Sequence, residues 1–110
     1  MSNPQDVELL LSGALDLSGC DLVGVDISGK DLRGRNFTNA NLTRVIANGS
    51  NFSDCTFEGS ICLGLSAKGS ICQNTNFKAG LNTASFLGAN LRGALFSRMF
   101  LEMLIFLKLI

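Results

Sequence analysis

The four cysteines are the residues of this chain with the widest range of possible chemistry, since they could form disulfides, bind zinc or act in redox reactions. They are Cys20, Cys55, Cys62 and Cys72, and no two of them form a CxxC pair. The chain also contains no histidine that could complete a zinc site. The role of these thiols therefore depends on where the pattern of the chain places them.

Side chains for other catalytic chemistry are scarce. The 110 residues include no histidine and no tyrosine, and they contain neither a nucleophile elbow nor a phosphate-binding loop. The segment GLSAKG at 64–69 brings a serine and a lysine together, but its two glycines fall on corners of the repeat described next. We therefore expect no enzymatic activity and no cofactor.

A large apolar residue, which we call the centre of a repeat unit, returns every fifth position. Small residues such as Ala47 and Ala67 replace it in places, and the period resumes at Leu81 after a one-residue slip. A fixed period of this kind predicts a solenoid, in which each unit buries its apolar side chain against its neighbours. The predicted core comprises Leu17, Leu22, Ile27, Leu32, Phe37, Leu42, Phe52, Phe57, Cys62, Cys72, Phe77, Phe86, Leu91 and Phe96.

The other positions of the unit also have a fixed character. The residue two before the centre is often small or apolar, and it shares the inward face because side chains alternate along an extended backbone. The residue between them points outward and is often Asp or Asn, which hydrogen-bond to nearby backbone in turns. Two residues after the centre lie most of the twelve glycines, which mark corners where the chain changes direction.

This register gives the cysteines and two basic residues specific places. All four cysteines fall on inward positions, so we expect reduced, buried thiols that pack as small hydrophobic groups in a reducing compartment, with a redox or metal role as the alternative. Lys30 and Arg35 also occupy inward slots, where an unpaired charge would be costly. Together with Arg33 they could form a basic binding site. Alternatively, the first coil is widened and both side chains extend to solvent, where Asp31 or Asp26 could pair with them.

The unit resembles the A(D/N)LxG motif of the pentapeptide-repeat proteins. It appears nearly unchanged as GANLRG at 88–93 and NANLTR at 39–44, and the resemblance covers roughly residues 14–97. The resemblance implies an all-β fold, a right-handed quadrilateral β-helix with one pentapeptide on each side and about four coils. It implies little about function.

Two segments suggest a narrower resemblance within that family. They are DVELLL at 6–11, directly before the repeats, and AKGSICQNTNFKAGL at 67–81, which breaks the register before it resumes. In these respects the chain is similar to the repeat tail of a eukaryotic BTB-domain protein of the potassium-channel-tetramerisation type. The BTB domain itself is absent, so the ubiquitin-ligase adaptor role of such proteins does not transfer.

Both ends of a solenoid need covering, because an open end exposes sheet edges and apolar core. Asn3 as N-cap, Pro4 at the first helical position and Gly13 as the stop predict a capping helix over residues 4–12, whose apolar face holds Val7, Leu10 and Leu11. We therefore divide the chain into a capping segment at 1–13, the β-helix at 14–97 and an apolar tail at 98–110.

The tail has several possible roles. Arg98 and Glu102 are spaced for a helix, which could cap the core or pair with a second copy; membrane-surface anchoring and a foreign tail that replaces further repeats are the alternatives. The residues of the tail that could make such contacts are Phe100, Leu104 and Phe106.

The function that these patterns favour is a noncatalytic scaffold that binds an unidentified protein partner, with an adaptor module as one form of it. Nine basic and nine acidic residues cancel, so we expect no nucleic-acid ligand. The start of the chain lacks a basic signal region, which favours a cytoplasmic location. The alternative is a DNA-mimicking protein that interacts with a topoisomerase or gyrase, but mimicry needs a stripe of negative charge along the solenoid, whereas Asp16, Asp21, Asp26 and Asp31 should form a ring around the first coil.

Overall fold

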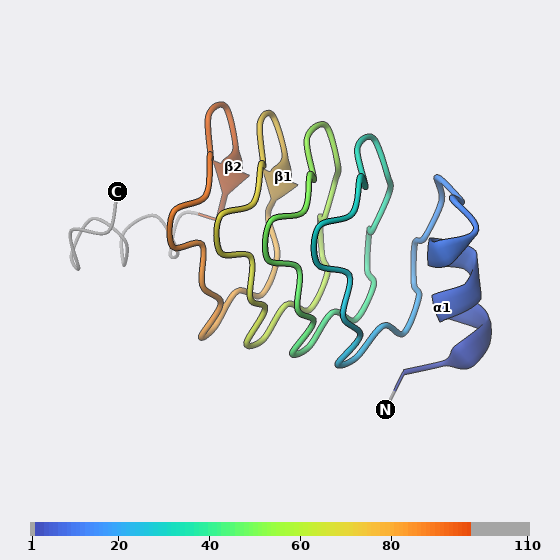
Figure 1. The fold of residues 1–110 in the computed structure, drawn as a ribbon. Helices are drawn as coiled ribbons and strands as arrows, with labels where there is room; N and C mark the ends of the chain where they lie inside the picture. Colours follow the sequence, from blue (N-terminus) through green and yellow to red (C-terminus); the bar gives the residue numbers. More distant parts are fainter. Residues whose placement is uncertain (1, 98–110) are drawn as a thin grey trace.

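The computed structural model describes residues 2–97 as a β-helix with a helix across one end (Figure 1). Helix α1 spans Pro4–Leu11, and strands β1 and β2 span Asn76–Phe77 and Leu95–Phe96. β1 and β2 are parallel neighbours, with Asn76 opposite Leu95. The earlier coils pair through single parallel bridges, because corners interrupt the extended chain every five residues.

Residues twenty apart lie above one another in this β-helix. Parallel bridges join Asp16 to Asn36, and the same twenty-residue spacing recurs at five-residue steps on each following side. After the one-residue slip the spacing falls to nineteen, as in the bridge from Ile61 to Gly80. The slip lies in a shortened corner, where the Ala79 amide donates to the carbonyl of Phe77 at 2.8 Å instead of closing the usual four-residue turn.

The usual corner is a hydrogen-bonded turn with a left-handed residue at its third position. In the first unit the Cys20 amide donates to the Leu17 carbonyl at 3.2 Å, and Gly19 between them has a φ of 70°. A type II turn requires such a positive φ at that position, which explains the five-residue spacing of the glycines. Non-glycine residues take the same conformation at five corners, which are Asn39, Arg44, Asp54, Asn74 and Thr83.

The interior is a continuous column of apolar side chains. Every predicted centre from Leu17 to Phe77 is fully buried, and Ala47 and Ala67 are buried beside them. Aromatic rings stack along one side, with 4.7 Å between the ring centroids of Phe37 and Phe57 and 4.7 Å between those of Phe57 and Phe77. Stacked rungs about 4.8 Å apart bring equivalent side chains into direct contact, so one residue per side suffices to fill the core.

The last coil departs from the expectation of full burial. Phe86, Leu91 and Phe96 are half-buried and pack against the core from its end. They differ from the earlier centres because no further coil follows within residues 2–97. Full burial of a centre therefore requires cover on both sides, from a second coil or, at the first coil, from helix α1.

Helix α1 lies across the first coil, and its own sequence sets its ends. The Asn3 side chain accepts hydrogen bonds from the amides of Gln5 and Asp6 at 2.9 and 3.3 Å, and Pro4 occupies the first turn. The helix ends at Leu11, one residue earlier than the sequence predicts, because Gly13 with a φ of 91° turns the chain into the first coil.

The helical segment also bonds backbone groups at the N-terminal edge of the first coil, where no preceding coil lies. The Asn3 amide donates to the Asp21 carbonyl at 3.0 Å, and the Asp6 carboxylate accepts from the Asp21 amide at 2.9 Å. Leu10 is 1% exposed in the core, whereas Leu11 is 55% exposed, contrary to the expectation that both face inward. Leu11 faces away because it is the last helical residue before the chain turns.

The predicted tail at 98–110, including Phe100, Leu104 and Phe106, lies outside the described residues.

Candidate functional site

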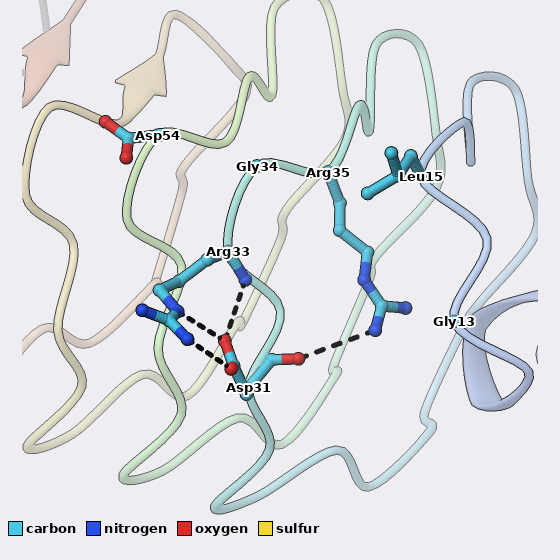
Figure 2. Close-up of a pocket in the computed structure, with 7 residues that line it drawn as sticks. All are labelled: Gly13, Leu15, Asp31, Arg33, Gly34, Arg35 and Asp54. Atoms are coloured by element: carbon cyan, nitrogen blue, oxygen red, sulfur yellow. Dashed lines mark hydrogen bonds and ion pairs between the residues drawn. The ribbon is translucent and has the colours of Figure 1, made fainter.

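Two of the three basic residues singled out in the sequence, Arg33 and Arg35, line a shallow pocket beside the first coil (Figure 2). Gly13 and Leu15, which follow helix α1, form one wall, and the corner that contains Arg33 and Arg35 forms the other. The remaining lining residues are Asp31, Gly34 and Asp54. Lys30 does not line the pocket, and its side chain is exposed to solvent.

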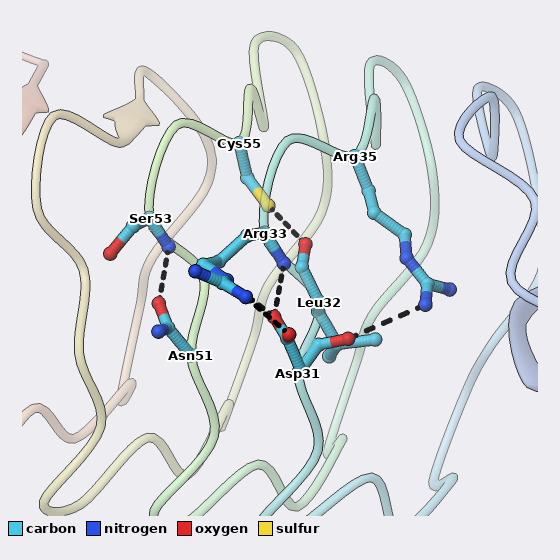
Figure 3. A network of polar contacts seen from close by, with 7 residues as sticks. All are labelled: Asp31, Leu32, Arg33, Arg35, Asn51, Ser53 and Cys55. Atoms are coloured by element: carbon cyan, nitrogen blue, oxygen red, sulfur yellow. Dashed lines mark hydrogen bonds and ion pairs between the residues drawn. The ribbon is translucent and has the colours of Figure 1, made fainter.

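Arg33 forms a bidentate ion pair with Asp31 at the mouth of this pocket (Figure 3). Its Nε and Nη2 donate to the two carboxylate oxygens at 2.8 Å each. These bonds, the Arg33 amide and the guanidinium charge lower the pKa of Asp31 to about 2. Because the pKa is lowered by folding, the stabilisation exists above the ordinary value of 3.8 and is lost as the pH falls toward 2.

Arg35 makes a different contact, which ties the repeats to the capping helix. Its Nη1 donates to the carbonyl of Leu10 in the last turn of α1 at 2.7 Å, and its Nη2 reaches the Asp31 carbonyl at 3.4 Å. A guanidinium at a helix C-terminus also interacts favourably with the helix dipole. The inward slot thus holds the stem of Arg35 only, while the charged group reaches out to the helix end.

The pocket is therefore poorly suited to bind an anion. Two carboxylates, Asp31 and Asp54, balance the two guanidinium groups that line it. Arg33 is committed to Asp31, and Arg35 is committed to backbone carbonyls. We assign this corner a structural role, in which it fastens α1 to the first coil.

We expect the Arg35→Ala substitution to lower the free energy of unfolding by about 1–2 kcal/mol, near the lower end of the range for hydrogen bonds from charged groups because Arg35 is half-buried. Urea denaturation followed by circular dichroism measures this change. Arg33→Ala is the matched control, and it should lower the free energy of unfolding by only about 0.5 kcal/mol, because its ion pair is exposed to solvent. An equal loss in both variants would contradict a specific role for Arg35.

The outward Asp and Asn side chains stabilise the corners. The Asp16 carboxylate accepts from the Ser18 amide at 3.0 Å, and the Asn36 side chain accepts from the Thr38 amide at 2.9 Å in the coil above. The four aspartates of the first coil lie on four successive sides, and the residues bridged to them are Asn36, Asn41, Ile46 and Asn51. Within the described residues the negative charge thus forms a ring and no stripe along the axis.

Aliphatic side chains replace these polar residues at a few outward positions. Ile61 and Leu63, which we call the aliphatic patch, are 46% and 40% exposed on one side of the β-helix. Ile61 is bridged to Gly80, which has no side chain to cover it. Arg44 lies at the equivalent corner of the preceding coil. Its Cγ is 3.5 Å from the position that a Cβ atom on Gly64 would occupy. Sequence reasoning did not single out this patch, although Ile at a position usually occupied by Asp or Asn is a visible signal.

The cysteines lie in the core and are poorly suited to redox chemistry. All four are free and buried. Burial raises the pKa of Cys55 to about 12 and the pKa values of Cys62 and Cys72 to about 11, so almost no thiolate forms at neutral pH. The Cys55 thiol donates to the Leu32 carbonyl at 2.8 Å (Figure 3). In residues 2–97 no three acidic or cysteine side chains cluster as metal ligands would.

Residues 2–97 contain no helix with the length and hydropathy of a membrane span.

Comparison with known proteins identifies the class to which this fold belongs. A family profile described as pentapeptide repeats matches residues 16–54 and 36–71, which together cover just over half of the chain. The chain therefore belongs to the pentapeptide-repeat family, whose fold is a noncatalytic repeat fold. No curated protein matches the sequence significantly.

Three solved structures illustrate the family resemblance. A pentapeptide-repeat protein from Nostoc is 18% identical with a TM-score of 0.39, and the alignment covers 84% of this chain and 74% of that one. HetL, a Nostoc pentapeptide-repeat protein involved in the regulation of heterocyst differentiation, is 21% identical with a TM-score of 0.37, with 73% of this chain and 46% of HetL covered. Rfr23 from Cyanothece is 17% identical with a TM-score of 0.30, with 84% and 92% covered. This chain thus matches less than half the length of HetL, and identities this low carry no information on function.

Proposed function

We propose that this chain is a noncatalytic scaffold that binds another protein through an outward side of its β-helix. The observation that carries the proposal is the aliphatic patch of Ile61 and Leu63 beside Arg44. The fold does not need an aliphatic residue at position 61, because the equivalent outward positions in the two preceding coils hold Asp21 and Asn41. The buried centre of a protein interface is more apolar than the rest of the surface, and arginine is enriched at interfaces.

The finer form of this proposal is an adaptor module that acts in the cytoplasm. Its support is the buried, reduced state of the four thiols, which suits a reducing compartment. A partner with an apolar surface and an acidic group near Arg44 would complement the patch.

The test replaces the patch with the polar residues that the repeat normally carries. In the variant Ile61→Asn with Leu63→Thr, the asparagine can accept from the amide at position 63, as Asn41 accepts from the Thr43 amide at 3.1 Å. We therefore expect the fold to be retained. Proteins captured from cell extract with the wild-type chain are purified and their dissociation constants measured by calorimetry. The double variant should weaken binding at least about tenfold, since loss of a central interface anchor costs more than about 1 kcal/mol.

The matched control is Ile71→Asn, because Ile71 is similarly exposed, at 41%, on a different side of the β-helix. It should leave the dissociation constant unchanged. If the captured partner binds the double variant as tightly as the wild type, the patch is not the binding surface. If the wild-type chain captures no protein with saturable affinity, the scaffold function itself is wrong.

A further inference from the structure

The last coil presents a row of backbone amides along the open edge of the β-helix. In earlier coils the amides of the centre and of the corner residue donate to carbonyls of the next coil, as Leu42 does to Ile61 at 2.6 Å and Gly69 to Leu87 at 2.8 Å. Five of the equivalent amides of the last coil have no backbone acceptor among residues 2–97. They belong to Leu81, Thr83, Gly88, Leu91 and Gly93.

Apolar side chains accompany these amides at the same end. Leu91 is half-buried, although Cys72 at the equivalent place in the preceding coil is fully buried. Leu87 and Leu95 are 74% and 54% exposed. An edge with free donors and apolar side chains is a template for pairing with another chain, and proteins usually cover such edges.

The opposite end of the β-helix cannot accept this edge. Helix α1 lies across the first coil, with Leu10 in the core and Arg35 bonded to its last turn (Figure 1). Copies of this chain therefore cannot stack head to tail without displacing α1. The occupants that remain for the C-terminal edge are the same edge of a second copy and the part of this chain beyond residue 97.

The chain itself continues from this edge. Residues 98–110, RMFLEMLIFLKLI, begin two residues after the end of β2 and are apolar at ten of thirteen positions. They contain no glycine, asparagine or aspartate, which supply almost all of the left-handed corners of the coils, so they are poorly suited to form another coil. As a helix they would be about 20 Å long, and the two shorter dimensions of the molecule are 22 and 18 Å.

We propose that residues 98–110 dock across the last coil as a C-terminal cap, and that they shield its edge from pairing with a second copy of the chain. Covalent attachment favours this occupant, since a tether of this length gives an effective concentration of about 1 mM or more. A second copy would have to compete at its free concentration. The cap makes the two ends of the molecule alike, each covered by an apolar segment adjacent to it in sequence.

Hydrogen–deuterium exchange of the full chain tests this proposal. In the wild type, the amides of Leu81, Thr83 and Gly88 should exchange more slowly than in an unstructured peptide, because the cap excludes water from them. The tail variant Phe100→Asp with Leu104→Asp should accelerate their exchange at least about tenfold. It should also convert a monomer into concentration-dependent oligomers in analytical ultracentrifugation. Lys108→Gln is the control and should change neither measurement.

Exchange in residues 36–57 shows whether the tail variant remains folded. The proposal is overturned if Leu81, Thr83 and Gly88 of the wild type already exchange at the unstructured rate, a result that does not depend on the variant. It is equally overturned if their protection in the wild type disappears on dilution, because the occupant would then be a second copy. Protection that requires phosphatidylcholine vesicles would assign the tail to a membrane surface and would also refute the cap.

Discussion

Replacing Phe57 by alanine is expected to lower the free energy of unfolding by about 3–5 kcal/mol, the range for loss of a fully buried aromatic side chain. Phe57 is 0% exposed and lies in the middle of the aromatic column. Its ring stacks on Phe37 and Phe77 at 4.7 Å each and meets Phe52 edge-on at 5.2 Å. Removing it leaves a cavity that neighbouring coils cannot close, because hydrogen bonds on four sides fix their spacing.

Urea denaturation of the purified full chain measures this loss. Phe57→Leu should cost less, since it retains most of the buried volume. Ile71→Ala serves as the exposed control and should cost no more than about 0.5 kcal/mol. A loss below about 1 kcal/mol for Phe57→Ala, where a buried aromatic should cost several times that, would mean that the column does not hold the coils together.

The second large effect is expected at the capping helix. Leu10→Ala should lower the free energy of unfolding by about 2–5 kcal/mol, because Leu10 is 1% exposed and seals the first coil. Leu11→Ala removes the same atoms from the next residue of the same helix. Leu11 is 55% exposed, so this control should have an effect of about 0.5 kcal/mol or less.

Hydrogen exchange tests whether the loss of stability arises because α1 no longer covers the first coil. If α1 closes the first coil, Leu10→Ala should accelerate exchange of the Asp21 amide, which donates to Asp6 of the helix. The amide of Asn41 one coil further donates to the Cys20 carbonyl and should respond less. Equal losses of stability for Leu10→Ala and Leu11→Ala would show that α1 does not act as a cap through Leu10.

The proposed partner surface and the proposed C-terminal cap are independent of each other. The aliphatic patch lies on a side of the β-helix, whereas the amide row lies at its end. Substitution of Ile61 and Leu63 should leave exchange at Leu81 and Gly88 unchanged. The two proposals can therefore fail separately.

The five-residue pattern was sufficient to predict the solenoid and its buried centres up to Phe77. The physical reason is local: each unit closes its own turn, and a centre such as Phe57 packs against the residues twenty positions away. The start of helix α1 was predictable for the same reason, because Asn3 as N-cap and Pro4 act within the first helical turn. Such features depend on neighbours along the chain or at one constant separation.

The contacts at the pocket and at the aliphatic patch could not be predicted from the five-residue repeat, because the residues involved are not related by it. The hydrogen bond from Arg35 to Leu10 joins residues 25 apart, Arg33 pairs with Asp31, and Lys30 does not line the pocket. The exposure of Ile61 depends on the shortened corner that places Gly80 above it. In this protein the repeat by itself determined the backbone and the core, because every unit closes the same hydrogen-bonded turn and buries one apolar side chain. Only the tertiary structure decided which charged and aliphatic side chains meet at the ends and sides, because those contacts arise where the repeat is broken or stops.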